Sequence, residues 1–269
     1  MDNMIVIDNL YFKYNDNIVF NNLNLSIKNG SITTVIGNNG SGKSTLVRIL
    51  SGLLEYDGSI YIDNILLCGR NIGQIRNKIG VVFENPDNSL ISETVLEDLA
   101  FPLQNMNFDR EYIYSRVNEI SKFIGISSLL NKCPRNLSGG EKQLVSLGCA
   151  LVTGPKVLIL DEALSMLDYN NKLRIFKVLK KINKKFGVTI INITHDIEES
   201  VYSDDILLID SGRVIIHDSK DVVYEKESLL NDFGIELPFM VSLSKKLSYY
   251  DLIDKNIYDI DEMVDVLWQ

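Results

Sequence analysis

Apolar positions recur along this chain with two different periods, and each period predicts a different kind of element. Residues 5–11 and 24–27 alternate apolar and polar side chains, as half-buried strands do. The run 189–193 is rich in β-branched residues, which is compatible with a strand buried in a parallel sheet. Between about 91 and 151 the apolar spacing becomes helical, so we expect an all-helical insertion there.

Other segments extend this α/β pattern. A helix is expected at about 171–186, ended by Gly187 in the position of a helix C-terminal glycine. The turn Ser211-Gly212 separates two strand-like runs and predicts a terminal hairpin. The remaining strands are expected at 31–36, 58–62, 79–83 and 157–160.

The character of the chain changes again beyond about residue 220. Residues 221–269 hold eleven acidic and four basic side chains, so this segment has a net charge of −7. It also carries Leu, Phe, Met and Trp, which favours a small folded domain over a disordered tail. The alternative is an acidic appendage that only aids solubility. We expect one domain at 1–220, with the helical subdomain inserted at about 85–151, and a second at 221–269.

Composition restricts the function classes. With 27 basic and 36 acidic residues the net charge is −9, which argues against a nucleic-acid binder. Three widely spaced cysteines predict free thiols, and the presence of only two histidines argues against a zinc site. No apolar run approaches the roughly 20 residues that span a bilayer, and we expect no signal peptide.

The strongest chemical signal lies at 37–45, where a predicted strand runs into a glycine loop and then a helix. The segment fits G-x-x-x-x-G-K-[ST], in which backbone N–H groups surround phosphates. Lys43 is expected to reach the β- and γ-phosphates, and the Ser44 hydroxyl to ligate Mg²⁺. The predicted ATP-binding residues are Gly37, Asn38, Asn39, Gly40, Ser41, Gly42, Lys43, Ser44 and Thr45.

A second signal is the apolar run Val157–Leu160 followed by Asp161 and Glu162. A strand that ends in a carboxylate places it at the edge of the sheet where α/β proteins bind ligands. Asp161 is expected to hold Mg²⁺, and Glu162 to polarise an attacking water. Alone, the pair could equally be helix-capping acids.

A third signal is Leu137-Ser138-Gly139-Gly140-Glu141, a Ser-Gly-Gly sequence that opens a helix and offers another anion-binding N-terminus. These three motifs in this order resemble the ATP-binding subunits of ABC transporters over about residues 1–220. The resemblance implies a P-loop NTPase of the ABC type, with a mixed sheet core, an inserted helical subdomain and a small C-terminal domain. It also implies a head-to-tail dimer, in which Ser138, Gly139, Gly140 and Glu141 contact the ATP on the partner's P-loop.

The resemblance extends to single residues. Tyr14 matches the aromatic residue that stacks on adenine, although it could be an ordinary core or surface aromatic. Asp168, in Ser165-Met166-Leu167-Asp168, matches the D-loop that communicates across the dimer. His195 matches the switch histidine that contacts the γ-phosphate, so the expected catalytic residues are Lys43, Glu162 and His195.

Two positions depart from the family pattern. Glu84 stands where the family places a glutamine that ligates Mg²⁺ and links the site to the membrane subunit. A carboxylate there could still bind Mg²⁺, but it would face the γ-phosphate, and two unit charges at ~4 Å repel by about 4 kcal/mol at an effective dielectric of ~20. We therefore expect Glu84 either to bind Mg²⁺ directly or to be protonated part of the time. Leu144 stands where the family often has arginine, which weakens an internal ion pair without abolishing activity.

Further segments are similar to energy-coupling-factor ATPases: Glu84-Asn85-Pro86-Asp87-Asn88, the D-loop, and the tail around Gly234–Pro238. This similarity implies uptake of a vitamin or transition metal. It also implies a second ABC ATPase, as homo- or heterodimer, a transmembrane coupling protein and a substrate-binding membrane subunit, with no nucleic acid. The chain would lie peripherally on the cytoplasmic face of the membrane. The alternatives are a non-hydrolysing half-site of a heterodimer and a soluble ABC ATPase without a transport role.

Overall fold

Two β-sheets and the helices around them form the molecule in the computed structural model, which describes residues 3–268. One sheet is antiparallel, in the order β2-β1-β4-β5, and the other has six strands in the order β10-β9-β3-β8-β7-β6. This arrangement confirms the predicted α/β class with a mixed sheet core. The strands are β1 Asn3–Tyr14, β2 Asn17–Lys28, β3 Ile32–Ile36, β4 Asp57–Ile62, β5 Ile65–Leu66, β6 Ile79–Phe83, β7 Val157–Asp161, β8 Thr189–Ile193, β9 Asp205–Asp210 and β10 Arg213–Ser219.

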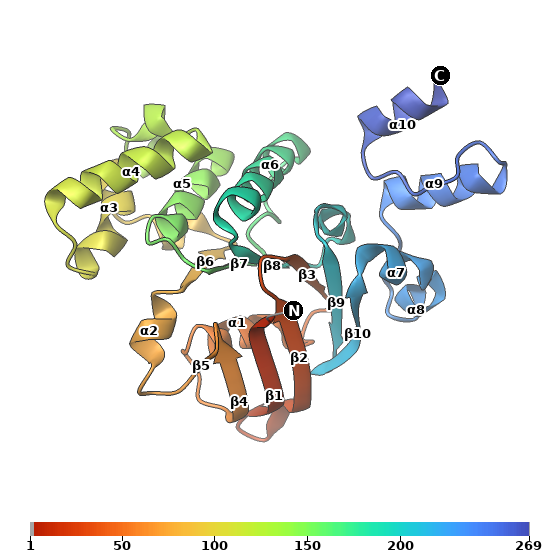
Figure 1. The fold of residues 1–269 in the computed structure, drawn as a ribbon, viewed down its shortest axis with the longest axis horizontal. Coiled ribbons are helices and arrows are strands. Elements are labelled where there is room, and N and C mark those ends of the chain that lie inside the picture. Colours follow the sequence, from red (N-terminus) through yellow and green to blue (C-terminus); the bar gives the residue numbers. More distant parts are fainter. Residues whose placement is uncertain (1–2, 269) are drawn as a thin grey trace.

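Helices pack on both sides of the six-stranded sheet (Figure 1). Helix α1 lies between the two sheets, because Leu46, Val47 and Leu50 share one apolar core with strands of both. The helices are α1 Lys43–Leu50, α2 Ile72–Arg76, α3 Val95–Asn105, α4 Arg110–Ile124, α5 Gly139–Leu151, α6 Tyr169–Phe186, α7 Lys220–Glu225, α8 Glu227–Asp232, α9 Phe239–Tyr249 and α10 Ile260–Leu267, with the 3₁₀ helices η1 Pro86–Asn88, η2 Ser127–Leu129, η3 Pro134–Asn136 and η4 Ile197–Tyr202.

The six-stranded sheet sets the position of the site. Strands β6, β7, β8, β3 and β9 are parallel neighbours, and only β10 runs antiparallel at the edge. The segments that follow β3, β6, β7 and β8 therefore leave from one edge of the sheet. These are the segments that carry the predicted P-loop, Glu84, Glu162 and His195.

The helical segment predicted between about 91 and 151 is observed as α3, α4 and α5. Thr94 starts α3 with a capping box: its hydroxyl accepts from the backbone N–H of Glu97, whose carboxylate accepts from Thr94 N–H. Helix α4 ends at Gly125, whose φ of 79° is in the left-handed region that favours glycine. Apolar faces of the three helices pack together and onto α6.

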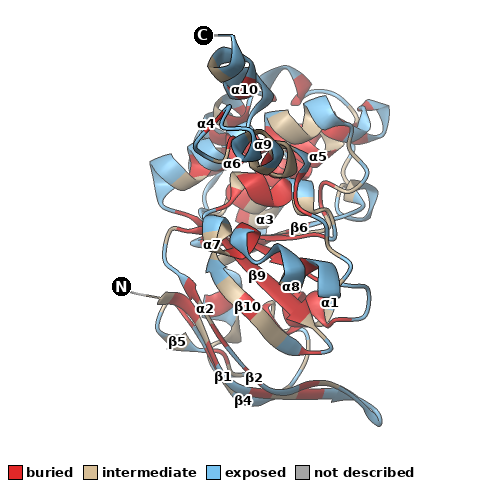
Figure 2. Ribbon diagram, turned by 90° about the vertical axis from the view of Figure 1, so that its right-hand side faces the viewer, coloured by how far each residue is buried: buried red, intermediate tan, exposed pale blue. Residues whose placement is uncertain are grey.

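The C-terminal segment has two parts. Helices α7 and α8 pack on β9 and β10, since Val223, Tyr224 and Leu230 share a core with Ile36 and Leu208. Helix α9 contributes Val241 to the same core, and its other face packs with α10 in a smaller cluster around Ile253 and Met263. Figure 2 shows α10 as largely exposed at the C-terminal end. The folding core of the larger unit thus continues past residue 220.

No helix within residues 3–268 is long and apolar enough to cross a membrane.

Candidate active site

Close packing fixes the P-loop between β3 and α1. A Cβ on Gly37 would lie 2.0 Å from the carbonyl oxygen of Ile209, and a Cβ on Gly42 would lie 2.8 Å from the Phe20 ring. Gly42 also has φ 106°, a conformation open mainly to glycine. The backbone N–H of Gly212 donates to the Ser41 carbonyl at 3.1 Å. Close contacts with β9 and β2 therefore require glycine at positions 37 and 42.

Lys43 lies inside the curve of this loop. Its ammonium donates to the carbonyls of Gly37 at 2.6 Å and Asn38 at 3.2 Å, and the residue is buried. Burial lowers the pKa of Lys43, while the negative charges of Glu162 and Asp161 act in the opposite direction. The cation is held where anionic phosphates could replace the carbonyl contacts.

The first turn of α1 offers further phosphate and metal ligands. Ser44 is exposed and Thr45 is partly buried in this turn, where backbone N–H groups lack helical partners. The Ser41 hydroxyl is buried, and no atom in the described part of the chain hydrogen-bonds to it. An orphaned hydroxyl in a cradle of backbone N–H groups suits a phosphate oxygen.

Three carboxylates gather beside the loop. Burial raises the pKa of Asp161, and the charges of Glu162 and Glu84 raise it further. One buried Asp161 oxygen has no hydrogen-bond partner among residues 3–268. The Ser165 hydroxyl lies 3.5 Å from a Glu84 carboxylate oxygen. These carboxylate and hydroxyl oxygens are the kind of ligand that a divalent cation such as Mg²⁺ prefers, so their negative charge suits a cation site.

Protein side chains alone do not complete such a cation site: within the described chain, no group of three or more His, Cys, Asp or Glu is arranged to hold a metal. A bound cation would take ligands from nucleotide oxygens as well, as Mg²⁺ usually does in phosphate-transfer sites.

Glu162 and His195 are in direct contact. The distance from His195 Nδ1 to Glu162 Oε2 is 2.8 Å, although 33 residues separate them. Glu162 is in the left-handed region, with φ 52°, and its N–H donates to the Ile193 carbonyl on β8. Such a conformation is unusual for a non-glycine residue and turns the side chain out at the strand end.

The signature segment starts α5. The Ser138 hydroxyl accepts from Glu141 N–H at 3.3 Å, and the Glu141 carboxylate accepts from Ser138 N–H at 2.9 Å. This contact with Ser138 holds the pKa of Glu141 below its usual range. A Cβ on Gly140 would lie 2.4 Å from the Asn171 amide oxygen, and both the N–H and the side-chain amide of Asn171 donate to Asp168. The structure thus joins the signature helix to the D-loop.

The signature segment and the P-loop belong to different layers: α5 lies with the helical segment, whereas α1 lies between the two sheets (Figure 1). Tyr14 lies at the end of the β1–β2 hairpin, with 39% of its surface exposed, and meets Phe12 edge-on at 4.8 Å. Its exposed ring is available for stacking, and its role stays a prediction.

Comparisons with known proteins extend these observations. Residues 20–165 match the ABC transporter family. The chain is 39% identical to the energy-coupling factor transporter ATP-binding protein EcfA1 of Ligilactobacillus salivarius, over 99% of this chain and 96% of that protein. The chain belongs to the ABC transporter ATP-binding family. This ABC ATPase is also 38% identical to EcfA1 of Streptococcus thermophilus, over 99% of this chain and 98% of that one.

Solved structures agree with this family. CbiO1 from Clostridium perfringens, described as part of the ABC transporter complex cbiONQ, has a TM-score of 0.81 and 33% identity, covering 94% of this ABC ATPase and all of that chain. The ATP-binding cassette MJ0796, solved as a dimer with ADP and phosphate, has a TM-score of 0.70 and 31% identity over 80% of this chain and 98% of its own. The predicted ABC-type P-loop fold is confirmed.

The position of Leu144 explains one departure from the family pattern. The side chain is buried in the core of the helical segment on α5, beside Val145 and Leu147. A leucine there contributes apolar burial, worth about 1.5 to 3 kcal/mol, in place of an ion pair.

Several contacts near the site are not indicated by any sequence motif. The Asn38 side chain donates to the Phe233 carbonyl at 3.2 Å, so the C-terminal segment touches the P-loop. Gln143 on α5 donates to the Phe83 carbonyl at 3.0 Å, immediately before Glu84. Lys172 forms two ion pairs beside His195. Each contact joins residues at least 24 positions apart, which a pattern along the chain does not reveal.

Proposed function

We propose that this ABC ATPase binds and hydrolyses ATP to power an uptake transporter of the energy-coupling-factor type, for a vitamin or a transition metal. The observation that carries hydrolysis is the 2.8 Å contact between Glu162 and His195 at the sheet edge beside the P-loop. The support for the transporter type is the similarity to EcfA1 proteins along nearly the whole chain, including the tail.

The proposed mechanism assigns one task to each residue. The loop 37–45 binds the phosphates through its backbone N–H groups, and Lys43 exchanges its carbonyl contacts for the β- and γ-phosphates. Glu162 orients the attacking water and accepts its proton. His195 holds the Glu162 carboxylate in place and contacts the γ-phosphate, and Tyr14 stacks on adenine.

Ser44, Asp161 and Glu84 would hold Mg²⁺ with the nucleotide. The cation, when bound, would neutralise charge that develops on the transferred phosphoryl group. The unpartnered Asp161 oxygen and the raised pKa of Asp161 support this assignment, since both are relieved by a cation.

A second ABC ATPase completes the site in this proposal. The partner's ATP would be contacted by Ser138, Gly139, Gly140 and Glu141. Asp168 would communicate with this segment through its contact with Asn171. The domain at 221–269 would contribute to dimerisation, and the helical subdomain would receive a transmembrane coupling protein. A substrate-binding membrane subunit completes the assembly, with this chain on the cytoplasmic face of the cell membrane.

Replacing Glu162 by glutamine tests the proposal. Because glutamine keeps the shape of the side chain but cannot accept the proton, we expect the hydrolysis rate to fall about 10²- to 10⁴-fold. ATP binding, measured by equilibrium dialysis, should be retained. Glu119→Gln is a matched control, since Glu119 is exposed on α4 and forms an ion pair with Arg116, away from the site. Turnover in Glu162→Gln equal to that of the wild type would overturn the assignment.

The cluster of three carboxylates favours one competing function, a non-hydrolysing half-site that completes its partner's site. Glu84 adds negative charge where the γ-phosphate would lie. That alternative predicts no turnover by wild type even with its membrane partners present, and restored turnover in Glu84→Gln.

A further inference from the structure

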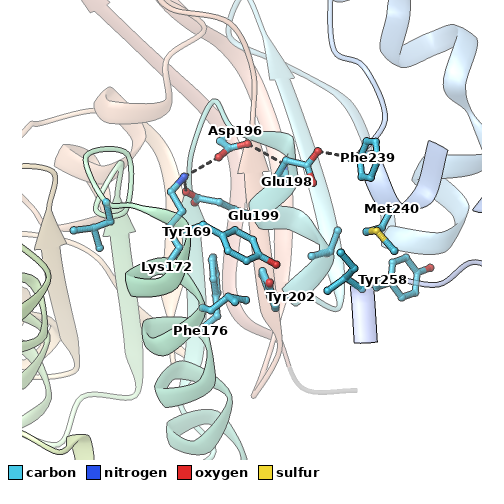
Figure 3. Close-up of a pocket in the computed structure, with 14 residues that line it drawn as sticks. Tyr169, Lys172, Phe176, Asp196, Glu198, Glu199, Tyr202, Phe239, Met240 and Tyr258 are labelled. Atoms are coloured by element: carbon cyan, nitrogen blue, oxygen red, sulfur yellow. Dashed lines mark hydrogen bonds and ion pairs between the residues drawn. The ribbon is translucent and has the colours of Figure 1, made fainter. Parts of the chain in front are cut away.

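Lys172 forms the centre of a charged cluster beside the switch histidine, at the wall of a cavity of about 500 Å³ between α6, η4 and the C-terminal helices (Figure 3). Its ammonium lies 2.7 Å from an Asp196 carboxylate oxygen and 2.9 Å from a Glu199 carboxylate oxygen. The Lys172 side chain is only 18% exposed and that of Glu199 is 2% exposed. The Lys172–Glu199 pair is therefore screened little by salt and costly to break, whereas the Asp196 side chain is 33% exposed.

Asp196 is the residue that follows His195, so its position limits where the imidazole can go. One Asp196 oxygen accepts from Glu198 N–H at 3.0 Å and starts η4, and the other accepts from Lys172. The Asp196 N–H donates to the Thr194 hydroxyl at 3.0 Å. The backbone after His195 is therefore held by η4 on one side and by Lys172 on the other.

Glu199 fixes Lys172 itself. Its second carboxylate oxygen accepts from the Asn192 side-chain amide at 3.0 Å, on β8 and three residues before His195. Lys172 thus binds to both sides of the switch segment: to Asp196 directly, and to Asn192 through Glu199. Burial alone would lower the pKa of Lys172, but its hydrogen bonds to Asp196 and Glu199 outweigh burial and raise it.

Lys172 also belongs to the D-loop helix. It lies in the first turn of α6, and its backbone N–H donates to the carbonyl of Asp168 at 3.0 Å. One residue therefore connects the start of the D-loop helix with the loop that carries His195.

We propose that Lys172 is a positioning residue for His195: by holding Asp196 it fixes the switch backbone so that the imidazole meets Glu162. The proposal rests on the hydrolytic function assigned above. It does not require Lys172 to touch ATP, since the ammonium is engaged by Asp196 and Glu199.

The test compares Lys172→Met with Lys172→Arg and with Lys78→Met. Lys78 is a matched control, since its side chain is 21% exposed and pairs with Asp63. It directly precedes β6, at the amino end of the strand, whereas the site residues follow the carboxyl ends of the strands. Rates are expressed per nucleotide-binding site, measured by ATP titration, so that misfolded protein does not contribute. Since a displaced catalytic group costs up to about 100-fold, we expect kcat of Lys172→Met to fall about 10- to 100-fold with an unchanged KM for ATP. Lys172→Arg should recover most of the rate, and Lys78→Met should retain it.

Two further variants separate positioning from a general loss of structure. Asp196→Asn removes the ion pair with Lys172, because the neutral amide has one acceptor oxygen in place of the two that now bind Lys172 and Glu198 N–H. It leaves Lys172 and Glu199 paired, so it should fold and reproduce the fall in kcat even if Lys172→Met is unstable. In a His195→Ala background, Lys172→Met should lower the single-turnover rate no further.

The proposal is overturned if Asp196→Asn hydrolyses ATP at the wild-type kcat, or if Lys172→Met lowers the rate equally with and without His195. These outcomes leave the proposed function intact as long as wild type turns over and Glu162→Gln does not.

Discussion

Asp161 is the residue at which stability and function oppose each other most clearly. Its carboxylate is partly buried beside Glu162 and Glu84, and its pKa is raised, first by burial and then by those charges. A raised carboxyl pKa means that the folded state binds protons more readily than the unfolded chain, so stability decreases as pH rises above the ordinary carboxyl range. The ionised Asp161 therefore destabilises the nucleotide-free protein at neutral pH.

We predict that Asp161→Asn raises the Tm of the nucleotide-free protein at pH 7 and raises it much less at pH 3.5, where the carboxyl is largely protonated in both the folded and the unfolded states. It should also abolish the rise in Tm that Mg²⁺ with ATP causes in the wild type. Glu84→Gln should show both effects to a smaller degree if Glu84 is a ligand. Scanning calorimetry at the two pH values checks this, and a lower Tm for Asp161→Asn at pH 7 would contradict it.

At the residue scale, sequence motifs identify side chains that phosphate chemistry requires, but not the side chains that hold them. Glu162 could be assigned a role because it follows a recognisable strand, and His195 because it matches the switch histidine of the family that the motifs resemble. The pairing of Lys172 with Asp196 and Glu199 gives no such signal, because lysine on a helix surface is usually solvated. Its partners become apparent only when α6 packs against η4.

The P-loop is the element whose shape depends most on its surroundings. Gly37 lies so close to β9 that a methyl group would collide with the Ile209 carbonyl, a backbone atom that cannot move aside. We predict that Gly37→Ala lowers the free energy of unfolding by about 1 to 3 kcal/mol or more and weakens ATP binding. Denaturant titration and equilibrium dialysis measure the two effects.

Gly69→Ala is the control for that substitution. In the part of the chain that the structure describes, a Cβ there has no neighbour within 4 Å beyond the adjacent residues, and Gly69 has no positive φ. Its unfolding free energy and ATP affinity should match the wild type. Equal losses in both variants would show that the close contact at Gly37 is not responsible.

The type of each element can be predicted from the period of its apolar residues, whereas the ends of a strand depend on how it pairs with its neighbours. The expected strands 79–83 and 189–193 are observed with those bounds, because each pairs along its length with β7 in a parallel register, although β8 is buried throughout and β6 is a partly exposed edge strand. Strands β1 and β2 extend well beyond the predicted 5–11 and 24–27. Asn9 and Asn22 have positive φ at irregularities in the pairing, which interrupt the alternation without ending the strands.

At the scale of the whole molecule, the acidic segment beyond 220 does not coincide with one packing unit. Helices α7 and α8 complete the core over β9 and β10, and α9 adds Val241 to that core while its other face packs with α10 in a smaller cluster. The charge of the chain changes at about residue 220, but the limits of a core are set by side-chain contacts and not by charge. Tyr224 is fully buried, and its hydroxyl lies 2.6 Å from that of Ser200 on η4.

Helix α10 carries an exposed apolar stripe. Ile260, Val264 and Leu267 are spaced by one helical turn and are 57%, 48% and 40% exposed. If this tail contributes to dimerisation, Val264→Glu should weaken the dimer by tenfold or more, since a charge would be desolvated, about 1.4 kcal/mol per factor of ten. Unfolding free energy should change by no more than about 0.5 kcal/mol, as for most surface substitutions.

Light scattering during size-exclusion chromatography measures that dimer, formed with itself or with a related ABC ATPase. Leu66→Glu, on the short edge strand β5 of the antiparallel sheet and 38% exposed, controls for added surface charge. A dimer unaffected by Val264→Glu would exclude this face from the interface.

The most direct test of the central claim is the ATP hydrolysis rate of the complex that this chain forms with membrane proteins. The tagged chain is expressed in its native host, extracted in mild detergent and assayed as wild type and as Glu162→Gln. The account predicts that integral membrane proteins co-purify with both forms and that only the wild-type complex hydrolyses ATP. A chain that purifies without any membrane protein, or a complex whose turnover is unchanged by Glu162→Gln, would contradict it.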